Sequence, residues 1–240
     1  MQLYLIRHAQ SFNNALAAGG GPERSRHFDP PLTELGRQQA QRLAEHMAQA
    51  NPAVVTAPGD PQNRAGFGLT HLYTSLMARA VITGTFLAER LGLPLQAWED
   101  WHEEGGLYLN DGDGQFVGQA GPSRADFARD YPALVLPDTL ADGGWWNRPF
   151  EAEAGRPERA RRVLARLLEE HGATDHNVAV ITHGGFVMHF LGALLCQTPP
   201  YHLSYLTGNT SLTRLSLTGE RRHLVYLNRC EHLPGELVTY

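Results

Sequence analysis

The strongest constraint on the fold is a run of four apolar residues, Leu3 to Ile6, that leads directly into Arg7 and His8. Four consecutive apolar residues are typical of a parallel strand that is covered on both faces. Open α/β sheets bind their ligands beyond the carboxyl ends of such strands, which would place Arg7 and His8 at a binding edge. The sequence therefore predicts an α/β fold in which His8 is the first functional side chain.

A second predicted strand ends in the same way. Residues 177–182 contain the apolar run Val-Ala-Val-Ile and lead directly into His183, Gly184 and Gly185. Because glycine has no Cβ, the backbone amides after His183 can approach whatever its imidazole faces. The carboxyl ends of neighbouring parallel strands meet at one edge of a sheet, so His8 and His183 can converge there.

A third strand end contributes an arginine. Residues 69–74 predict a short strand, Ser75 is a good N-cap, and residues 76–91 are expected to form a helix. Arg79 then falls near the first turn of that helix, where the helix dipole disfavours a cation by a few tenths of a kcal/mol. A bound anion would remove the conflict, whereas the alternative is a solvated arginine that reaches sideways.

The remaining pattern completes a three-layer α/β/α sandwich, with a mostly parallel central sheet, helices on both faces and an inserted lid region. With 240 residues, 42% of them hydrophobic, the chain is expected to form one domain, 1–240, with insertions at about 51–68 and 105–155. We expect loops at 12–31 and 51–68, the second of them mobile. We expect helices at 33–47, 123–131, 157–170 and 186–195, and a hairpin of strands at 211–217 and 223–227.

Composition argues against several classes of partner. A net charge of −5 and a pI near 6.2 leave no basic surface for nucleic acid or for an anionic membrane. No stretch approaches the roughly 18 apolar residues that span a bilayer, and no basic leader precedes the first strand. Cys196 and Cys230 form no metal-ligand cluster and are expected to be reduced, mostly buried thiols, which points to a cytoplasmic protein.

The first strand end reads Arg7-His8-Ala9-Gln10-Ser11, and further short motifs stand at residues 29–36, 73–75, 79–80, 182–185 and 209–211. Taken together, these motifs resemble the histidine phosphatase family, also called the phosphoglycerate mutase-like superfamily, whose signature is a strand followed by Arg-His-Gly. The resemblance covers most of the chain, except residues 51–68 and 107–155. Ala9 stands where the family has glycine and Gln10 where Glu is frequent, and neither change removes a side chain that carries the chemistry.

The resemblance implies a role for each matching residue. His8 would be the nucleophile that takes the phosphoryl group, and Arg7, Arg79 and His183 would form the phosphate pocket. Two guanidinium groups neutralise phosphoryl oxygens and disfavour protonation of a neighbouring imidazole, so His8 would stay neutral and nucleophilic. Further phosphate contacts would come from Asn14 and from the amide of Gly184. The chemistry implies no cofactor.

The family takes the proton for the leaving alkoxide from a carboxylic acid that follows the second helix. The candidates here are Glu99, Asp100, Glu103 and Glu104. We expect Glu103 to be this acid, because His102-Glu103 followed closely by two glycines best matches the family pattern. The triplet His102, Glu103 and Glu104 could also suggest a metal, but no further ligand stands at a helpful spacing, so we predict no metal.

The insertion bears on both recognition and reaction. Trp145, Trp146 and Arg148 would form either an aromatic, cationic lid over the substrate or a packing unit for the insertion, and both remain open. The mutase branch of the family presents several basic residues from its insertion to hold a carboxylate. Here the insertion offers only Arg124, Arg129 and Arg148 against six aspartates, namely Asp111, Asp113, Asp126, Asp130, Asp138 and Asp142.

The expected function is therefore that of a phosphomonoesterase, acting on small-molecule phosphomonoesters through a phosphohistidine at His8. The alternative is a cofactor-dependent phosphoglycerate mutase, which returns the phosphoryl group to its substrate instead of passing it to water. A non-catalytic phosphate-binding protein is a third reading, which the presence of Arg7, His8, Arg79 and His183 disfavours. The natural substrate and the oligomeric state do not follow from these motifs.

Overall fold

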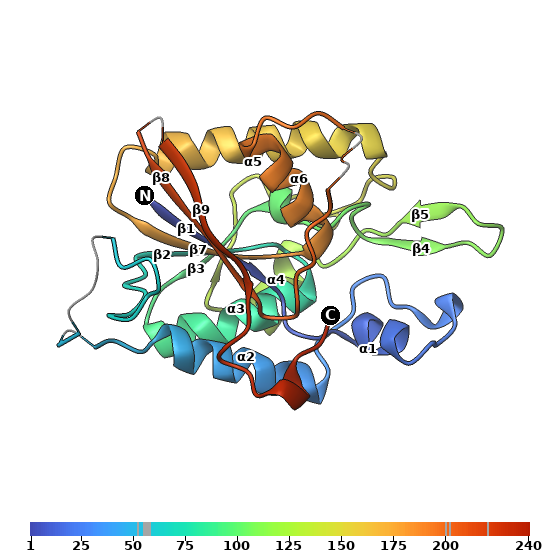
Figure 1. Ribbon diagram of the computed structural model, residues 1–240. Helices are drawn as coiled ribbons and strands as arrows, with labels where there is room; N and C mark the ends of the chain where they lie inside the picture. The colour runs from blue at the N-terminus through green and yellow to red at the C-terminus, as the bar shows by residue number, and fades with distance from the viewer. Residues whose placement is uncertain (52, 55–58, 200, 202, 220) are drawn as a thin grey trace.

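The computed structural model describes residues 1–51, 53–54, 59–199, 201, 203–219 and 221–240 (Figure 1). Its centre is a seven-stranded sheet. Across the sheet, five neighbouring strands run parallel to one another, and the two strands at the remaining edge are added by antiparallel pairing. In spatial order the strands are β6 (Leu134–Val135), β3 (Leu95–Ala97), β2 (His71–Thr74), β7 (Asn177–Thr182), β1 (Gln2–Arg7), β8 (Leu212–Thr218) and β9 (Arg221–Arg229).

Helices cover both faces of this sheet (Figure 1). One face carries α5 (Arg156–His171) and α6 (Gly184–Leu194), and the other carries α2 (Glu34–Met47) and α3 (Ala78–Leu91). The predicted three-layer α/β/α architecture with a mostly parallel sheet is confirmed. The predicted hairpin near the end of the chain is also confirmed, because β8 and β9 pair antiparallel.

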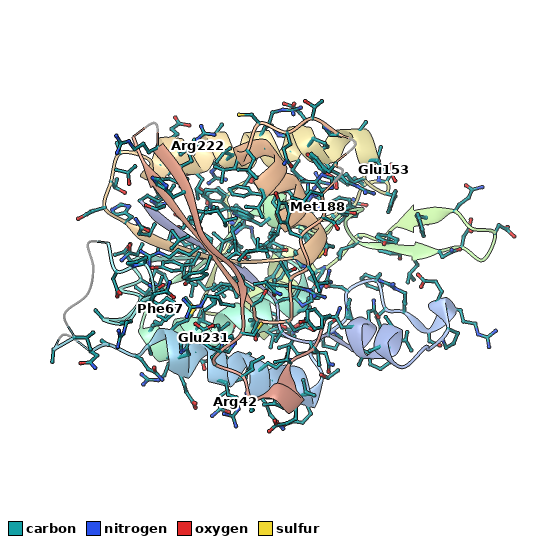
Figure 2. All side chains as sticks on the ribbon, in the orientation of Figure 1. Arg42, Phe67, Glu153, Met188, Arg222 and Glu231 are labelled. Atoms are coloured by element: carbon teal, nitrogen blue, oxygen red, sulfur yellow. The ribbon has the colours of Figure 1, made fainter. Side chains whose placement is uncertain are left out.

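Strand β1 lies in the interior of the sheet, and its side chains alternate between two cores. Leu3 and Leu5 pack with apolar residues of α5 and α6. Tyr4 and Ile6 point to the opposite face and pack with apolar residues of α2 and α3. All four side chains are at most 1% exposed, as a four-residue apolar run predicts. Figure 2 shows side chains filling the space on both sides of the sheet.

The two helices on the α2 and α3 face begin differently. Thr33 caps α2 as predicted, because its hydroxyl accepts from the backbone N–H of Gly36 at 3.0 Å. Helix α3, in contrast, begins at Ala78, with Met77 at the N-cap, so the expectation of an N-cap at Ser75 and a start at residue 76 is wrong. The Ser75 hydroxyl instead accepts from the N–H of Met77 and contacts a histidine of the site described below.

Residues 12–31, expected to be a loop, contain helix α1 (Phe12–Ala18) and a short 3-10 helix (Glu23–Ser25). A capping box starts α1, because Ser11 Oγ accepts from the N–H of Asn14 while Asn14 Oδ1 accepts from the N–H of Ser11. This local pairing supports a single short helix within a glycine-rich stretch. In Figure 1 this segment protrudes from the same side of the molecule as a small hairpin formed by β4 (Tyr108–Asn110) and β5 (Phe116–Gly118).

The insertion at 105–155 has more regular structure than its weak periodicity indicates. It contains the hairpin β4 (Tyr108–Asn110) and β5 (Phe116–Gly118), helix α4 (Arg124–Asp130) and edge strand β6 of the main sheet. Helix α4 matches the predicted short helix, with Ser123 at its N-cap. The strands of two or three residues are too short to show a period in the sequence.

Trp145 and Trp146 pack inside this insertion. Each is 4% exposed, and they form a separate core with Leu107 and Phe127. Arg148 stacks on Trp146 at 4.0 Å from the ring centroid. These contacts favour the packing interpretation of the tryptophan pair over a lid that closes on a substrate.

The described part of the 51–68 segment is attached to the body of the protein. Gly66 pairs with Ala50 in an isolated bridge, and Phe67, labelled in Figure 2, is 5% exposed and belongs to the α2 and α3 core. Asn63 Nδ2 donates to the hydroxyl of Tyr4 at 2.8 Å. The predicted mobility of this loop concerns in part residues 52 and 55–58, which lie outside the described residues.

Both cysteines are free, but the expectation that they are mostly buried is wrong. Cys196 is exposed and Cys230 is half-buried. Cys196 follows the end of α6, where the chain adopts a positive φ of 55° and turns away from the core. Among the described residues, no helix combines the length and the apolar character needed to cross a bilayer.

Close packing requires glycine at position 36, which the sequence alone did not indicate. This requirement leads to a prediction about stability. A Cβ at this position would lie 2.1 Å from the carbonyl oxygen of Gln10, which belongs to the segment after His8. We expect Gly36→Ala to lower the free energy of unfolding by about 3 kcal/mol, because backbone must move to accommodate the methyl group. Urea unfolding measures this, with Gly235→Ala as the control, since a Cβ there meets nothing within 4 Å. Equal stability of the two variants would contradict the prediction.

Candidate active site

Three strand ends meet at one edge of the sheet. Strands β1 and β7 pair in parallel with Arg7 opposite Thr182, so the residues that follow them, His8 and His183, are neighbours. Their ring centroids lie 5.0 Å apart, and both side chains are buried. Strand β2 pairs with the other side of β7 and brings Ser75 to the same edge. The predicted convergence of the two histidines is therefore observed.

The imidazole of His8 is held at both of its nitrogen atoms. Arg79 Nε, which can only donate, lies 3.1 Å from His8 Nε2. His8 Nδ1 lies 2.7 Å from the carbonyl oxygen of Ala9, which can only accept. The proton therefore resides on Nδ1, and Nε2 has the lone pair. This is the tautomer that an Nε2 nucleophile requires.

The surroundings of His8 oppose its protonation. Burial holds the pKa of His8 well below its usual range, and the guanidinium groups of Arg79 and Arg7 lower it further. Arg79 is itself 9% exposed and occupies the second position of α3. His8 is therefore a neutral imidazole at neutral pH.

His183 is fully buried next to His8. Its Nε2 lies 2.9 Å from Ser75 Oγ, and its Nδ1 has no hydrogen-bond partner within the described part of the chain. Because the N–H of Met77 already donates to Ser75 Oγ, the hydroxyl proton is free to point at Nε2 of His183. That arrangement leaves an N–H at Nδ1. Burial holds the pKa of His183 well below its usual range, with smaller contributions from Arg79 and His8.

Arg7 lies beside the first turn of α6. Its NH1 group donates to the carbonyl oxygen of Thr207, whereas its buried Nε has no partner among the described residues. A Cβ on Gly184 would lie 3.5 Å from Arg7 Nε, so the start of the helix and the guanidinium group are in close contact. Gly184 is the first residue of α6, two residues earlier than the predicted start of that helix.

Glu103 points at the N-terminus of α6. Its carboxylate accepts from the N–H of Phe186 at 2.9 Å, of Glu104 at 2.9 Å and of Gly185 at 3.3 Å. Backbone N–H groups and the positive end of the helix dipole stabilise a carboxylate there. Gly185 makes this position accessible, because a Cβ on it would lie 2.6 Å from Glu103 Oε1. Glu103 also lines the cavity that contains His8.

The other candidate acids have different surroundings. Glu104 binds His189 Nε2 at 2.9 Å and Arg156 NH1 at 3.0 Å, and the hydrogen bond to His189 is the main cause of its lowered pKa. Glu99 and Asp100 lie in a short 3-10 helix (Glu99–Trp101) and are not part of the cavity wall. Of the four carboxylates, Glu103 is the one that both lines the cavity and lies close enough to Arg7 and Arg79 to raise the pKa of each.

The triplet considered as a metal site is divided among three partners. His102 Nδ1 donates to the carbonyl oxygen of Glu103, and its ring packs edge-on against Trp146. The carboxylate of Glu103 faces α6, and that of Glu104 faces Arg156. The three side chains thus do not converge on a common point.

Asn14 lines the cavity, but its side chain is already engaged. Asn14 Oδ1 accepts from Ser11 within the capping box of α1 and from Nδ2 of Asn209 at 3.3 Å. Asn209 also donates to the carbonyl oxygen of His8 at 3.0 Å. Asn14 therefore has its amide N–H group left for a ligand, and Asn209 holds the backbone of the nucleophile in place.

Sequence reasoning did not select Asp29 as a functional residue. Its Oδ1 accepts from the N–H of Ala78 at the start of α3, at 2.9 Å, and its Oδ2 has no partner among the described residues. Burial raises the pKa of Asp29 to about 6, although Arg79 opposes this rise. Asp29, Ser75, Gly185 and Asn209 all act by holding the named site residues. Asp29, Ser75 and Asn209 stand within the recognised motifs, which was the available signal.

The cavity over His8 has a volume of about 120 Å³. One wall comes from α1 and the segment after it, and the other comes from the Glu103 segment and strand β4. The lining residues are Arg7, His8, Ser11, Asn13, Asn14, Arg26, His27, Phe28, Pro30, Arg79, Glu103, Glu104, Gly106 and Tyr108. His183 and Gly184 are not among these lining residues, although the His183 ring lies 5.0 Å from that of His8.

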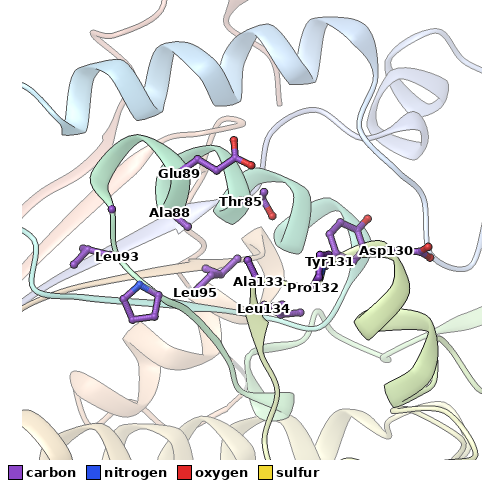
Figure 3. A pocket seen from close by; sticks show the side chains of 12 residues that line it. Thr85, Ala88, Glu89, Leu93, Leu95, Asp130, Tyr131, Pro132, Ala133 and Leu134 are labelled. Atoms are coloured by element: carbon purple, nitrogen blue, oxygen red, sulfur yellow. The ribbon is translucent and has the colours of Figure 1, made fainter.

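A larger cavity, about 540 Å³, lies away from these residues (Figure 3). It is formed by the end of α3, strand β3 and the segment before β6, and Leu93, Leu95 and Leu134 line it. It contains neither a histidine nor an arginine. The chemistry is therefore concentrated in the smaller, polar cavity.

The lowered pKa of His8 generates a spectroscopic prediction. Because the folded protein keeps His8 neutral, its ¹⁵N resonances should stay those of the Nδ1–H tautomer throughout the pH range in which free imidazole becomes protonated. In Arg79→Gln one of the two cations is gone, so protonation should occur at higher pH than in the parent protein. Histidine-labelled protein and NMR measure both, with added free imidazole as the titration reference. A His8 signal that titrates together with free imidazole would contradict the assignment.

The sequence is similar to a known protein family and to several characterised or named proteins. A family model described as the histidine phosphatase superfamily, branch 1, matches residues 3–229. A Hydrogenobacter thermophilus protein with the provisional name phosphoserine phosphatase 2 is 25% identical over 235 residues, or 96% of this chain and 97% of that protein. Glucosyl-3-phosphoglycerate phosphatase of Mycobacterium tuberculosis is 27% identical over 223 residues, covering 90% of this chain and 85% of that protein.

A solved structure shares the fold. The crystal structure of a phosphoserine phosphatase from Entamoeba histolytica, in complex with 3-phosphoglyceric acid, superimposes with a TM-score of 0.60. The sequence identity is 19%, and the match covers 97% of this chain and 99% of that chain. Because the family model spans nearly the whole sequence, the chain belongs to the histidine phosphatase superfamily.

Proposed function

We propose that the protein is a phosphomonoesterase that works through a phosphohistidine at His8. The observation that carries this proposal is the neutral imidazole of His8 at the floor of a polar cavity, with its Nδ1–H fixed by the Ala9 carbonyl. An Nε2 lone pair held between two arginines suits in-line attack on phosphorus. The named phosphatases among its relatives support hydrolysis as the reaction.

The reaction has two steps. In the first, His8 Nε2 forms a bond to phosphorus, the phosphorus–oxygen bond of the ester breaks, and the leaving oxygen takes a proton that Glu103 has taken up from solvent as the anionic ester binds beside it. In the second, the Glu103 carboxylate takes a proton from water, the water oxygen attacks phosphorus, and the nitrogen–phosphorus bond breaks. Inorganic phosphate and neutral His8 are the products, and the chemistry needs no cofactor.

The surrounding groups stabilise the charge of the transferring phosphoryl group. Arg7 and Arg79 both lie near enough to Glu103 and to each other to set up one positive region over His8. The Nε of Arg7 and the Nδ1 of His183, which have no partner in the described part of the chain, are buried donors that a phosphoryl oxygen would satisfy. The amide of Gly184 and the N–H group of Asn14 would complete the phosphate contacts.

The substrate is proposed to be a small phosphomonoester that also carries an anionic group. Beyond the phosphate pocket, the cavity wall presents the exposed cationic Arg26 and the neighbouring His27. Phosphoserine and glucosyl-3-phosphoglycerate, named for the relatives, both have such a carboxylate. Small-molecule chemistry suits a cavity of this size, and a cytoplasmic location stays a prediction.

Glu103→Gln tests the proton donor. The variant keeps the size of the side chain but cannot protonate a leaving group, so kcat/KM, which reports the first step without the hydrolysis of phosphohistidine, should fall by about 10²- to 10⁴-fold for alkyl phosphates. The loss should be much smaller for p-nitrophenyl phosphate, whose leaving group needs no proton. Glu99→Gln, outside the cavity, is the matched control and should behave like the parent protein. Equal losses on both kinds of substrate would exclude Glu103 as the acid.

A second experiment separates a phosphatase from a mutase. With 3-phosphoglycerate as substrate, the proposal predicts free phosphate as the main product and little 2-phosphoglycerate, because the insertion has few of the cations with which the mutase branch holds its substrate's carboxylate. Enzymatic assays quantify both products in the same reaction. His8→Ala should release no phosphate above background. Predominant 2-phosphoglycerate would favour the mutase, and full activity of His8→Ala would exclude the phosphohistidine.

A further inference from the structure

Three histidines that are distant in the sequence meet at the end of the sheet opposite the active site. His71 is the first residue of β2, His176 directly precedes β7, and His171 is the last residue of α5. Strands β2 and β7 are parallel, so their amino ends lie together. The active site lies beyond the carboxyl ends, a full strand length away, about 13 Å or more. These histidines are therefore independent of the phosphoryl chemistry.

The three rings are packed against one another. Their centroids are 4.7 Å apart for His71 and His171, 4.3 Å for His71 and His176, and 5.2 Å for His171 and His176. One nitrogen of each ring lies within 4.8 Å of the corresponding nitrogens of the other two. His171 is 3% exposed, and the other two are half-buried, so the cluster is accessible from one side.

The neighbours of His71 leave one of its nitrogens free to act as a ligand. Thr70 Oγ1 lies 2.8 Å from His71 Nδ1 and donates its own proton to the carbonyl oxygen of Asn177. The Thr70 hydroxyl, which also accepts from the N–H of Asn177 at 3.1 Å, engages Nδ1 of His71, so Nε2 is the nitrogen left to bind an ion. Metal-binding histidines are usually held by such a hydrogen bond at the nitrogen that does not bind the metal.

His171 is held in a similar way. Its Nε2 lies 2.9 Å from the hydroxyl of Tyr73 and 3.9 Å from the carboxylate of Glu170. Its Nδ1 lies 3.0 Å from Nδ1 of His176, so two imidazole nitrogens share one proton between them. A metal ion can replace that proton, which is then released to solvent.

We propose that His71, His171 and His176 bind a first-row divalent cation such as Zn²⁺. Imidazole is a preferred ligand for Zn²⁺, Ni²⁺ and Cu²⁺, and three histidines with an open fourth position form a known type of zinc site. Tetrahedral Zn–N bonds of about 2.1 Å place the ligand nitrogens about 3.4 Å apart. His171 and His176 already have a similar separation, and the others need to approach by at most about 1.4 Å through ring rotation of the half-buried side chains.

Such an ion would connect the end of α5 to two neighbouring strands. The ion binds a set of ligands that the unfolded chain does not hold together, so binding stabilises the folded state. Ligands that are close in sequence, such as His102 and the two glutamates that follow, can be found from a local pattern. The members of this cluster come from three separate elements, so no local pattern indicates them.

The test uses protein without a histidine tag, freed of metal by chelator. Calorimetry with Zn²⁺ and visible absorption with Co²⁺ measure the stoichiometry and the affinity, and thermal unfolding measures stabilisation. We expect one equivalent to bind and the Tm to rise. His71→Ala and His176→Ala should each weaken binding by about 100-fold or more. His176→Asn, which retains a polar side chain of moderate size, covers the case in which an alanine variant fails to fold.

Two controls separate this cluster from other histidines. His8→Ala, which disrupts the active site, and His223→Ala, which removes an exposed histidine of β9, should both bind the ion like the parent protein. Absence of binding at about 100 μM Zn²⁺ would overturn the proposal. So would binding that the His71 and His176 variants leave unchanged, or binding that His8→Ala abolishes. All of these readouts are independent of phosphatase activity.

Discussion

Two guanidinium groups buried beside the imidazole of His8 keep that ring neutral, and the candidate site depends on its neutral state. A charged His8 between Arg7 and Arg79 would place three positive charges in a water-poor pocket, so the ring stays neutral. The Ala9 carbonyl then fixes the proton on Nδ1, and the lone pair of Nε2 has only one direction in which to point. The fold brings the three groups together because β1 ends, and α3 begins, at the same edge of the sheet.

Helices α3 and α6 both begin at this edge of the sheet, and their N-termini lie next to side chains of opposite charge. Helix α3 presents a cation, Arg79, at its second position, where the helix dipole opposes it, and the carboxylate of Asp29 accepts from the first turn of the same helix. Helix α6 instead receives the carboxylate of Glu103 on its backbone amides, at a glycine that leaves room for it. One start therefore keeps positive charge available for an anion, and the other anchors the group proposed to move protons.

Long buried elements were predictable from the sequence, and short ones were not. Strands β1 and β7, the hairpin of β8 and β9, and helices α2 and α5 have an apolar run, an alternation or a capping residue that one local stretch contains. Strands β3 and β6 have two or three residues, and their existence depends on neighbours that only the folded chain supplies. The start of α3 was misplaced because Ser75 is a good cap in isolation, whereas its hydroxyl pairs with His183 in the fold.

The candidate site shows the same division. His8, His183, Arg7 and Arg79 stand at strand ends and helix starts that the pattern could locate. The choice among the four neighbouring carboxylates rested on the resemblance, and what distinguishes them physically is tertiary: Glu104 is occupied by His189 and Arg156, whereas Glu103 meets α6. The histidine cluster at the other end of the sheet depends wholly on such long-range proximity, so no local pattern could have indicated it.

The hydrogen bond from Arg79 Nε to His8 Nε2 links anion binding to the reactivity proposed for His8. A lone pair that accepts from a guanidinium cannot attack phosphorus at the same time, so attack requires Arg79 to donate elsewhere. A ligand releases the lone pair only by offering Arg79 a better acceptor, and a doubly charged phosphoryl group is such an acceptor. In the proposed mechanism, the group that is transferred is therefore also the group that draws Arg79 away from His8, and a neutral molecule entering the cavity would leave the lone pair of His8 engaged.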